Sequence, residues 1–266
     1  MTYRLLARGL WAWAVLWLLL FGIGSAWIAG APVSPLGRVA FAAEMPQDEF
    51  ERRVRDYLLA HPEVIGEAIN RLEAKHAETN AAAAKTALKA RVDEVFRDPD
   101  SPVSGNPAGE VTLVEFFDYN CPYCRAMAPL MDQAEKADPR LRIVYKEFPI
   151  LGPDSVFAAK AALAAARQGK YVAFHRALYE GRGHVDAAKV LAVAKALGLD
   201  VEKMKSDMGD SAISAMLEKN LKLAQALNIT GTPGFVVGDQ VKTGATDFEG
   251  LKALIAKGRS SETNAK

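Results

Sequence analysis

The sequence predicts an α/β protein in which a small mixed sheet is interrupted by a helical block and preceded by a helical arm. Two runs of β-forming residues, at 111–117 and 141–150, flank a helical stretch. An alanine-rich region at about 155–228 has helical composition, and "GTPGFVVGDQVKTGA" then returns to strand and turn before a last helix. This order places the helical block in a crossover connection of the sheet.

The N-terminal stretch has the composition of an export signal. Arg4 and Arg8 precede the uncharged run "LWAWAVLWLLLFGIGSAWIAGAP". Secretory hydrophobic cores are about 7–15 residues long, and a membrane span needs about 20. We therefore expect residues 1–42 to be a cleaved signal peptide, with an uncleaved anchor at residues 10–31 as the alternative. Either version places the rest of the chain in the periplasm, because the arginines stay inside.

The helical region that follows is longer than an ordinary globular helix. Phe50 and Val54 recur at helical spacing, and Pro62 suits the first turn of a second helix that runs without another proline to about Phe96. At 1.5 Å per residue this second helix is about 50 Å long. It cannot bury its apolar stripe against a compact domain along that length. We expect residues 44–96 to form an oligomerisation arm, with a solvent-bridging helix as the alternative.

The sequence also predicts a linker before the domain and a flexible segment after its last helix. Residues 97–110 contain three prolines and two glycines, which predicts a linker before a domain at 111–258. Asp247 is a suitable N-cap for the last helix. The polar residues 259–266 are expected to form a flexible tail.

Charge and histidine placement exclude some classes of function. The formal net charge is +1, and without residues 1–42 it is −2, with 30 Lys+Arg against 32 Asp+Glu. This balance predicts no nucleic-acid partner. The histidines at 61, 76, 175 and 184 are scattered without ligand spacing, so each is expected to be a surface or hydrogen-bonded residue.

Cys121 and Cys124 are the two cysteines of the chain, three positions apart and directly after a predicted strand. They could form a structural clamp, half of a metal site, or a working dithiol. A disulfide between them closes too small a loop to stabilise the chain much. A structural zinc site needs four ligands, and no second pair is present. We expect a working dithiol with no metal and no cofactor, and metal binding between subunits remains the alternative.

The position of the two cysteines assigns them different chemistry. Cys121 precedes a helix that begins near Pro122, and the unpaired N–H groups and positive end of a helix favour a thiolate. Cys124 lies one turn further along, within reach of a mixed disulfide formed at Cys121. The spacing predicts an exposed nucleophile and a sheltered resolving thiol, the parts needed for thiol–disulfide exchange.

These residues resemble those of a known family. "VEFFDYNCPYC" resembles the active-site strand and helix of the thioredoxin-fold disulfide oxidoreductases of the DsbA type, and "GTPGFVVG" resembles their cis-proline loop. "FERRVRDYLLAHPEVIGEAINRLEA" resembles the N-terminal oligomerisation segment of the suppressor-of-copper-sensitivity C proteins (ScsC). The resemblance implies a thioredoxin fold with a helical insertion at about 155–228 and a homo-oligomer, dimer or trimer, formed through residues 44–96.

The resemblance also implies site residues. Cys121 matches the nucleophile and Cys124 the resolving cysteine. Thr232 and Pro233 match the loop that faces the dithiol and pairs with an extended substrate through a cis X–Pro bond. Glu115 matches a buried carboxylate, which should have a raised pKa and exchange a proton with Cys124, although a strand-edge charge is the alternative.

The dipeptide between the cysteines, Pro122-Tyr123, bears on the direction of the reaction. Strongly oxidising members of the family carry histidine at the second position, and Tyr123 cannot supply a positive charge. We therefore expect an exported disulfide isomerase that acts on unfolded or misoxidised exported proteins and is reset by a membrane redox partner. The alternatives are a DsbA-like dithiol oxidase and a copper-binding or copper-buffering protein. Phe116 and Phe117 are assigned to the core, and Tyr119 is left unassigned.

Overall fold

The computed structural model describes residues 45–263 of the chain. The expected signal peptide or anchor lies outside the described residues. None of the helices within them has both the length and the apolar composition needed to cross a membrane. The chain divides into two units, Met1–His61 and Pro62–Lys266, which are described separately.

The described part of the first unit is helix α1, Gln47–Ala60. None of its residues is buried, and Phe50, Tyr57 and Leu59 are all more than half exposed. Ion pairs such as Arg53–Glu49 at 2.6 Å add only tenths of a kcal/mol to an isolated helix. Helix α1 therefore has no core of its own, and its apolar side chains are available to a partner.

The second unit begins with α2, Glu63–Ala90, and α3, Val92–Phe96. The expected continuous helix to Phe96 is interrupted at Arg91, whose backbone leaves the helical region. The first half of α2 exposes its apolar side chains, whereas Leu88 and Val95 are buried in the domain core. The expectation that all of residues 44–96 form the arm is therefore corrected, because the last turns of α2 and all of α3 belong to the domain.

A mixed five-stranded sheet forms the centre of the second unit, with the strand order β1-β3-β2-β4-β5. Strands β2 and β3 are parallel, and all other neighbours are antiparallel. The mixed α/β sheet expected from the sequence is confirmed. The strands are β1 Val103–Gly105, β2 Val111–Phe117, β3 Leu141–Glu147, β4 Gly234–Val237 and β5 Gln240–Thr243.

Strand β1 lies within residues 97–110, which the sequence predicted to be a linker. It pairs with β3, and Ser104 lies opposite Ile143. A strand of three residues is too short to show a hydrophobic alternation among prolines and glycines. The linker expectation is corrected, since this segment supplies an edge of the sheet.

Alternation along the strands assigns side chains to two faces. Leu113 and Phe117 pack on the face that α4, Pro122–Ala137, covers. Val114 and Phe116 pack on the opposite face with Leu88 of α2. Both phenylalanines are therefore core residues, as expected, but on opposite sides of the sheet.

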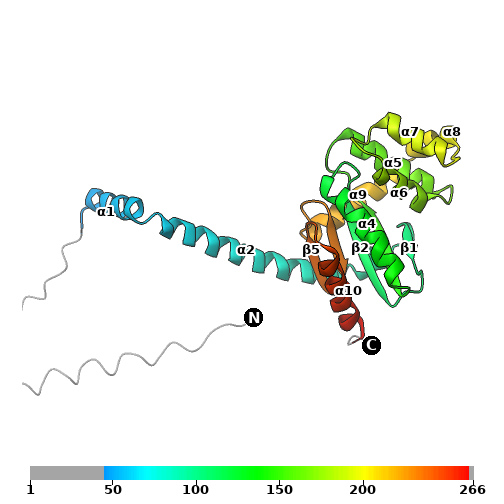
Figure 1. Ribbon diagram of the computed structural model, residues 1–266. Helices are drawn as coiled ribbons and strands as arrows, with labels where there is room; N and C mark the ends of the chain where they lie inside the picture. Colours follow the sequence, from blue (N-terminus) through cyan, green and yellow to red (C-terminus); the bar gives the residue numbers. More distant parts are fainter. Residues whose placement is uncertain (1–44, 264–266) are drawn as a thin grey trace, which may run out of the picture. The chain divides into compact units, whose positions relative to one another are not determined.

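The helical insertion follows β3 and precedes β4 in the sequence, and it contains five helices. Figure 1 shows these helices gathered together at one end of the sheet. Three of them begin with an aspartate N-cap whose carboxylate accepts a backbone N–H of the first turn. The thioredoxin-like fold with an inserted helical region is thus confirmed. The helices are α5 Pro153–Ala166, α6 Tyr171–Glu180, α7 Ala187–Ala196, α8 Val201–Met208 and α9 Ser211–Ala226.

The last helix, α10, spans Phe248–Thr263. The Asp247 carboxylate accepts the N–H of Gly250 at 2.8 Å, so the expected N-cap is confirmed. The expected flexible tail from residue 259 is corrected, because the helix continues to residue 263. Arg259 forms an ion pair with Asp138 beyond α4, which ties this end of the helix to the domain.

Candidate active site

The two cysteines lie where strand β2 ends and helix α4 begins. Cys121 is the N-cap of α4, with an extended backbone, and Pro122 is the first helical residue. Both thiols are free and buried, with Cys121 only 4% exposed. The expectation of an exposed nucleophile is corrected, because neighbouring side chains and loops cover the sulfur. Tyr123 between the cysteines is 64% exposed and marks the accessible surface of the site.

The loop before β4 faces the dithiol from the other side. The Thr232–Pro233 bond is cis, and the Cys121 sulfur lies 3.3 Å from the Thr232 carbonyl oxygen, to which it donates when it is protonated. Gly234 then enters β4 opposite Phe116 of β2. Pairing of β2 with β4 therefore brings residues 111 positions apart into contact.

The two thiols have opposite acid–base properties. Hydrogen bonds from the Cys124 thiol and then from the Thr232 side chain lower the pKa of Cys121 to about 5, although burial opposes them. Burial raises the pKa of Cys124 far above its ordinary value, and the hydrogen bond to Cys121 and the charge of Glu115 raise it further. Cys121 is thus a thiolate at neutral pH, and Cys124 is a thiol.

Glu115 lies on the sheet face that α4 covers and is only 3% exposed. Burial raises the pKa of Glu115 to about 8, with the charge of Cys121 as the second cause. Glu115 is therefore not a charged residue at the edge of the sheet, because its side chain is buried. Near neutral pH it can hold or release a proton next to the dithiol.

Sequence reasoning missed a second buried carboxyl group on the same face, that of Glu147 at the end of β3. The hydroxyls of Tyr119 and Tyr171 donate to its Oε1 at 3.1 and 2.7 Å. Its Oε2 has no hydrogen-bond partner among the described residues. Burial raises the pKa of Glu147 well above its usual value. A charged residue at the end of the apolar run "RIVYKEF" was the signal that could have indicated it.

Tyr119, which the sequence left unassigned, is a buried member of this cluster. Its hydroxyl lies 3.1 Å from Nδ1 of His175, whose pKa burial lowers to about 3. His175 is therefore neutral at physiological pH. The charges of Asp118 and Glu115 also raise the pKa of Glu147, so each negative charge there opposes the formation of another.

Two polar networks hold the start of α4 in place. The Asp118 carboxylate accepts the N–H groups of Ile150 and Leu151 and the hydroxyl of Ser155. The Arg125 guanidinium donates to four backbone carbonyls, at residues 119, 179, 181 and 183. These contacts fix the cysteine loop against the helical insertion.

Within residues 45–263, no group of three or more His, Cys, Asp or Glu side chains is arranged to hold a metal ion. His184 lies 2.8 Å from the Asp154 carboxylate, and His175 contacts Tyr119. The absence of a metal or cofactor remains an expectation.

The site and the arm both match known families. The DSBA-like thioredoxin domain family matches residues 112–256, which include the cysteines, the buried Glu115 and the Thr232–Pro233 loop. The family described as the copper resistance protein ScsC N-terminal domain matches residues 47–78. The second match ends before the part of α2 that is buried in the domain.

Solved structures agree with both matches. A thioredoxin-like oxidoreductase from Silicibacter pomeroyi DSS-3 is 46% identical, with a TM-score of 0.62, and covers 63% of this chain and 97% of its own. Proteus mirabilis ScsC, in a structure of its compact conformation, is 29% identical in sequence, with a TM-score of 0.62. The match covers 81% of this chain and 99% of that chain. A periplasmic thioredoxin-like protein from Salmonella enterica serovar Typhimurium is 29% identical, with a TM-score of 0.55. The match covers 64% of this chain and 95% of that chain.

Similarity also extends to part of a larger protein. The Na(+)/H(+) antiporter NhaA 1 of Salinispora arenicola is 29% identical over 161 residues, which are 59% of this chain and 25% of the antiporter. The chain thus spans about a quarter of the length of the first curated relatives that it matches. The two family matches together show that the chain belongs to the DSBA-like thioredoxin domain family and carries an ScsC N-terminal domain.

Proposed function

We propose that the protein is an exported disulfide isomerase that uses the Cys121–Cys124 dithiol to rearrange disulfides in unfolded or misoxidised exported proteins. The Cys121 thiolate attacks a substrate disulfide, so that one substrate sulfur leaves as a thiolate and the other becomes bonded to Cys121. A second substrate thiolate then attacks the bound substrate sulfur. This forms a new substrate disulfide and returns the Cys121 thiolate, with no net change in oxidation.

Cys124 provides an escape from a mixed disulfide that does not resolve. Its thiolate attacks the Cys121 sulfur, which forms the Cys121–Cys124 disulfide and releases the substrate as a thiol. A membrane redox partner would then reduce the pair again. The periplasmic Salmonella relative supports an exported location.

Glu115 has a defined part in this escape step. In the reduced site the Cys121 thiolate is one cause of its raised pKa, so Glu115 holds its proton. When Cys121 enters a mixed disulfide, this negative charge disappears and the pKa of Glu115 falls. Glu115 can then ionise and accept the proton of Cys124, which produces the attacking thiolate.

The observation that carries the isomerase assignment is the exposed apolar surface of the N-terminal helices. On α2, Ile65, Ile69 and Leu72 are about half exposed. Apolar side chains at helical spacing outside a compact domain favour self-association, and the ScsC N-terminal match supports the same conclusion. An oligomer holds several dithiols near one substrate, so a chain released by one site is recaptured by another at high effective concentration.

The test removes the arm without opening the domain core. A chain that starts at residue 79 lacks the ScsC-like segment but keeps Leu88 and Val95, which a deletion through residue 96 would remove. It should be monomeric in sedimentation, retain dithiol exchange, and lose most of its ability to refold a scrambled multi-disulfide substrate. A full-length monomer, or undiminished isomerase activity in the shorter chain, would contradict the proposal.

Point variants on α2 provide a matched comparison. Ile69→Lys places a charge on the apolar stripe and should dissociate the oligomer. Asn70→Lys adds the same charge at the next, also exposed, position and should leave the mass unchanged. If both variants behave alike, a general charge effect rather than the stripe controls assembly.

A dithiol oxidase is the second candidate, and the acidic Cys121 thiol favours it. A pKa of about 5 stabilises the reduced form, which makes the disulfide form more oxidising. Equilibration with glutathione and oxidative refolding of a reduced substrate distinguish the two functions. Rapid oxidation by the full-length chain without rearrangement of scrambled substrate would favour the oxidase.

Copper binding or buffering is the third candidate, because the matching N-terminal family is described as a copper resistance protein. The two cysteines supply soft ligands at the site, whereas the thioethers of Met127 and Met131 on α4 are buried in the core. Copper(I) titration of the reduced chain and of Cys121→Ser distinguishes this candidate. Stoichiometric, tight binding that the substitution abolishes would support it.

A further inference from the structure

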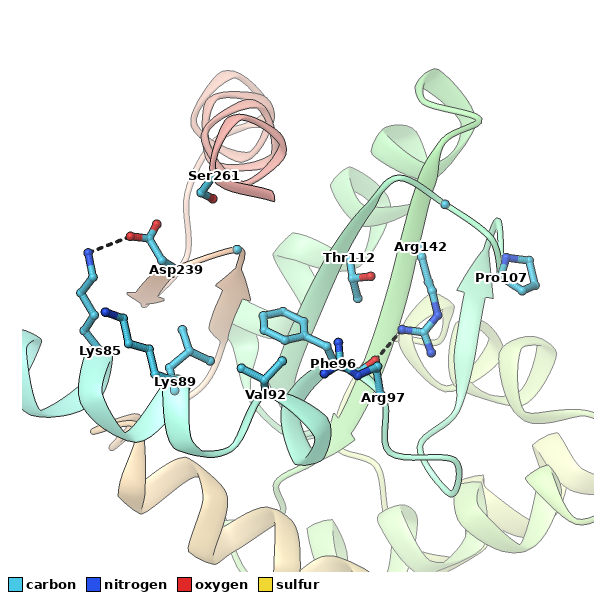
Figure 2. A pocket seen from close by; sticks show the side chains of 13 residues that line it. Lys85, Lys89, Val92, Phe96, Arg97, Pro107, Thr112, Arg142, Asp239 and Ser261 are labelled. Carbon is cyan, nitrogen blue, oxygen red and sulfur yellow. Dashed lines mark hydrogen bonds and ion pairs between the residues drawn. The ribbon is translucent and has the colours of Figure 1, made fainter. Parts of the chain in front are cut away.

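A pocket lies at the edge of the sheet where β2 and β3 begin. It has a volume of about 750 Å³, within the range of about 300–1,000 Å³ typical of small-molecule sites. Figure 2 shows Lys85, Lys89 and Phe96 on one side and Thr112 and Arg142 on the strands. The dithiol follows the opposite ends of these strands, about 20 Å away for a seven-residue strand. The pocket is therefore separate from the candidate active site.

Cations converge on this pocket from different elements. Lys85 is paired with Asp239 at 2.8 Å, and Arg97 with Asp93 outside the pocket lining. Lys89, by contrast, has no carboxylate within ion-pair distance among the described residues. The pocket therefore has an excess of positive charge that the charges of the domain do not neutralise.

Arg142 is the second cation there without a carboxylate partner in the described part of the chain. Its Nη1 donates to the Phe96 carbonyl at 2.7 Å, which fixes the guanidinium at the pocket wall. Partial burial penalises its charge and lowers its pKa. An anion beside it would offset this loss of hydration and accept its remaining N–H groups.

The wall between these cations is apolar. Val92 and Phe96 of α3 and Leu88 of α2 line it, and the Thr112 and Ser261 hydroxyls lie among the lining groups. A simple hydrated anion would leave this apolar wall unused, and an uncharged hydrocarbon would leave the cations unpaired. We propose that this pocket binds a small organic anion with a carboxylate or phosphate head and an apolar body. Arg142 on the strands and Lys89 on the far side of the apolar wall supply the positive charge that attracts the head, and Val92 and Phe96 contact the body.

Octyl phosphate is the probe for this proposal, titrated calorimetrically into the full-length reduced protein. We expect one molecule to bind per chain. Octyl glucoside, with the same body and no charge, and inorganic phosphate, with no body, should bind at least about tenfold more weakly, because each lacks one of the two interactions. Equal affinity for octyl glucoside would overturn the proposal. Binding to phosphatidylglycerol vesicles without binding of free octyl phosphate would also overturn it, since that pattern indicates surface attraction only.

Substitutions locate the binding. Lys89→Gln and Arg142→Gln should each weaken octyl phosphate binding about tenfold or more, the effect of losing a charge-assisted hydrogen bond. Lys75→Gln is the matched control, since it removes a lysine from the exposed part of the same helix. If Arg142→Gln does not fold, the comparison of Lys89→Gln with Lys75→Gln decides by itself. Equal affinity of these two lysine variants would refute the assignment. The thiol exchange rate of Lys89→Gln should match that of the wild type.

Discussion

Replacing Glu115 with glutamine tests whether a buried, proton-holding carboxyl group lies beside the dithiol. The pKa of Glu115 rises from 4.5 to about 8 in the folded protein. A group with a raised pKa binds its proton more tightly when folded, so stability falls as pH rises from 4.5 towards 8. At about 1.4 kcal/mol per pH unit, this dependence amounts to about 3 kcal/mol at pH 7 and about 5 kcal/mol above pH 8.

Glutamine has a similar shape and cannot ionise, so Glu115→Gln should lose this part of the pH dependence. Denaturant unfolding of the reduced protein and of the variant between pH 4.5 and 9 measures it. The difference in unfolding free energy should move in favour of the variant by about 3 kcal/mol between pH 4.5 and 7. Glu180→Gln is the control, since its carboxylate is exposed. A difference that does not change with pH would refute a raised pKa at Glu115.

Three further predictions concern the neighbouring groups. Thiolate absorbance of Cys121 should titrate near pH 5 in the reduced protein, and Cys124→Ala should raise this pKa towards 9, because it removes the main hydrogen bond to the thiolate. Glu147→Leu should cost about 2–5 kcal/mol in unfolding free energy, since two buried phenols lose their acceptor, whereas Glu147→Gln keeps the acceptor oxygen and should cost less. Lys146→Met should cost about 1–3 kcal/mol in unfolding free energy, because it removes a buried partner of Asp98 while the Asp98 ion pair with Lys219 remains. Thermal unfolding of the double variant with Asp98→Leu should show partial recovery.

Local patterns in the sequence were sufficient for the two cysteines and for the order of strands and helices from β2 onward. Runs of apolar residues and turn residues report secondary structure, because each pattern lies within a short segment of chain. The dithiol was recognisable because Cys121 and Cys124 lie on one helical turn after a strand. Asp247 was predictable as an N-cap for the same reason, since it acts on the next three residues.

Contacts between distant segments decided what local patterns could not. The long helix is interrupted at Arg91, and Leu88 and Val95 on either side of the break are buried in the core. Strands later in the chain form that core, so the break depends on distant residues. The three residues of β1 become a strand because β3 offers its edge. Neither outcome has a signal within its own segment.

The sequence by itself determined that a pair of cysteines, Cys121 and Cys124, lies at the start of a helix directly after a strand, because this placement depends only on neighbours within a short segment of chain. Only the tertiary structure decided the environment of that pair. It buried Cys121 beneath Thr232, which is 111 residues away, and brought Glu147 onto the same face as Glu115. Burial and hydrogen bonding set the pKa of each of these groups, and both arise from strands that the chain brings together only when it folds.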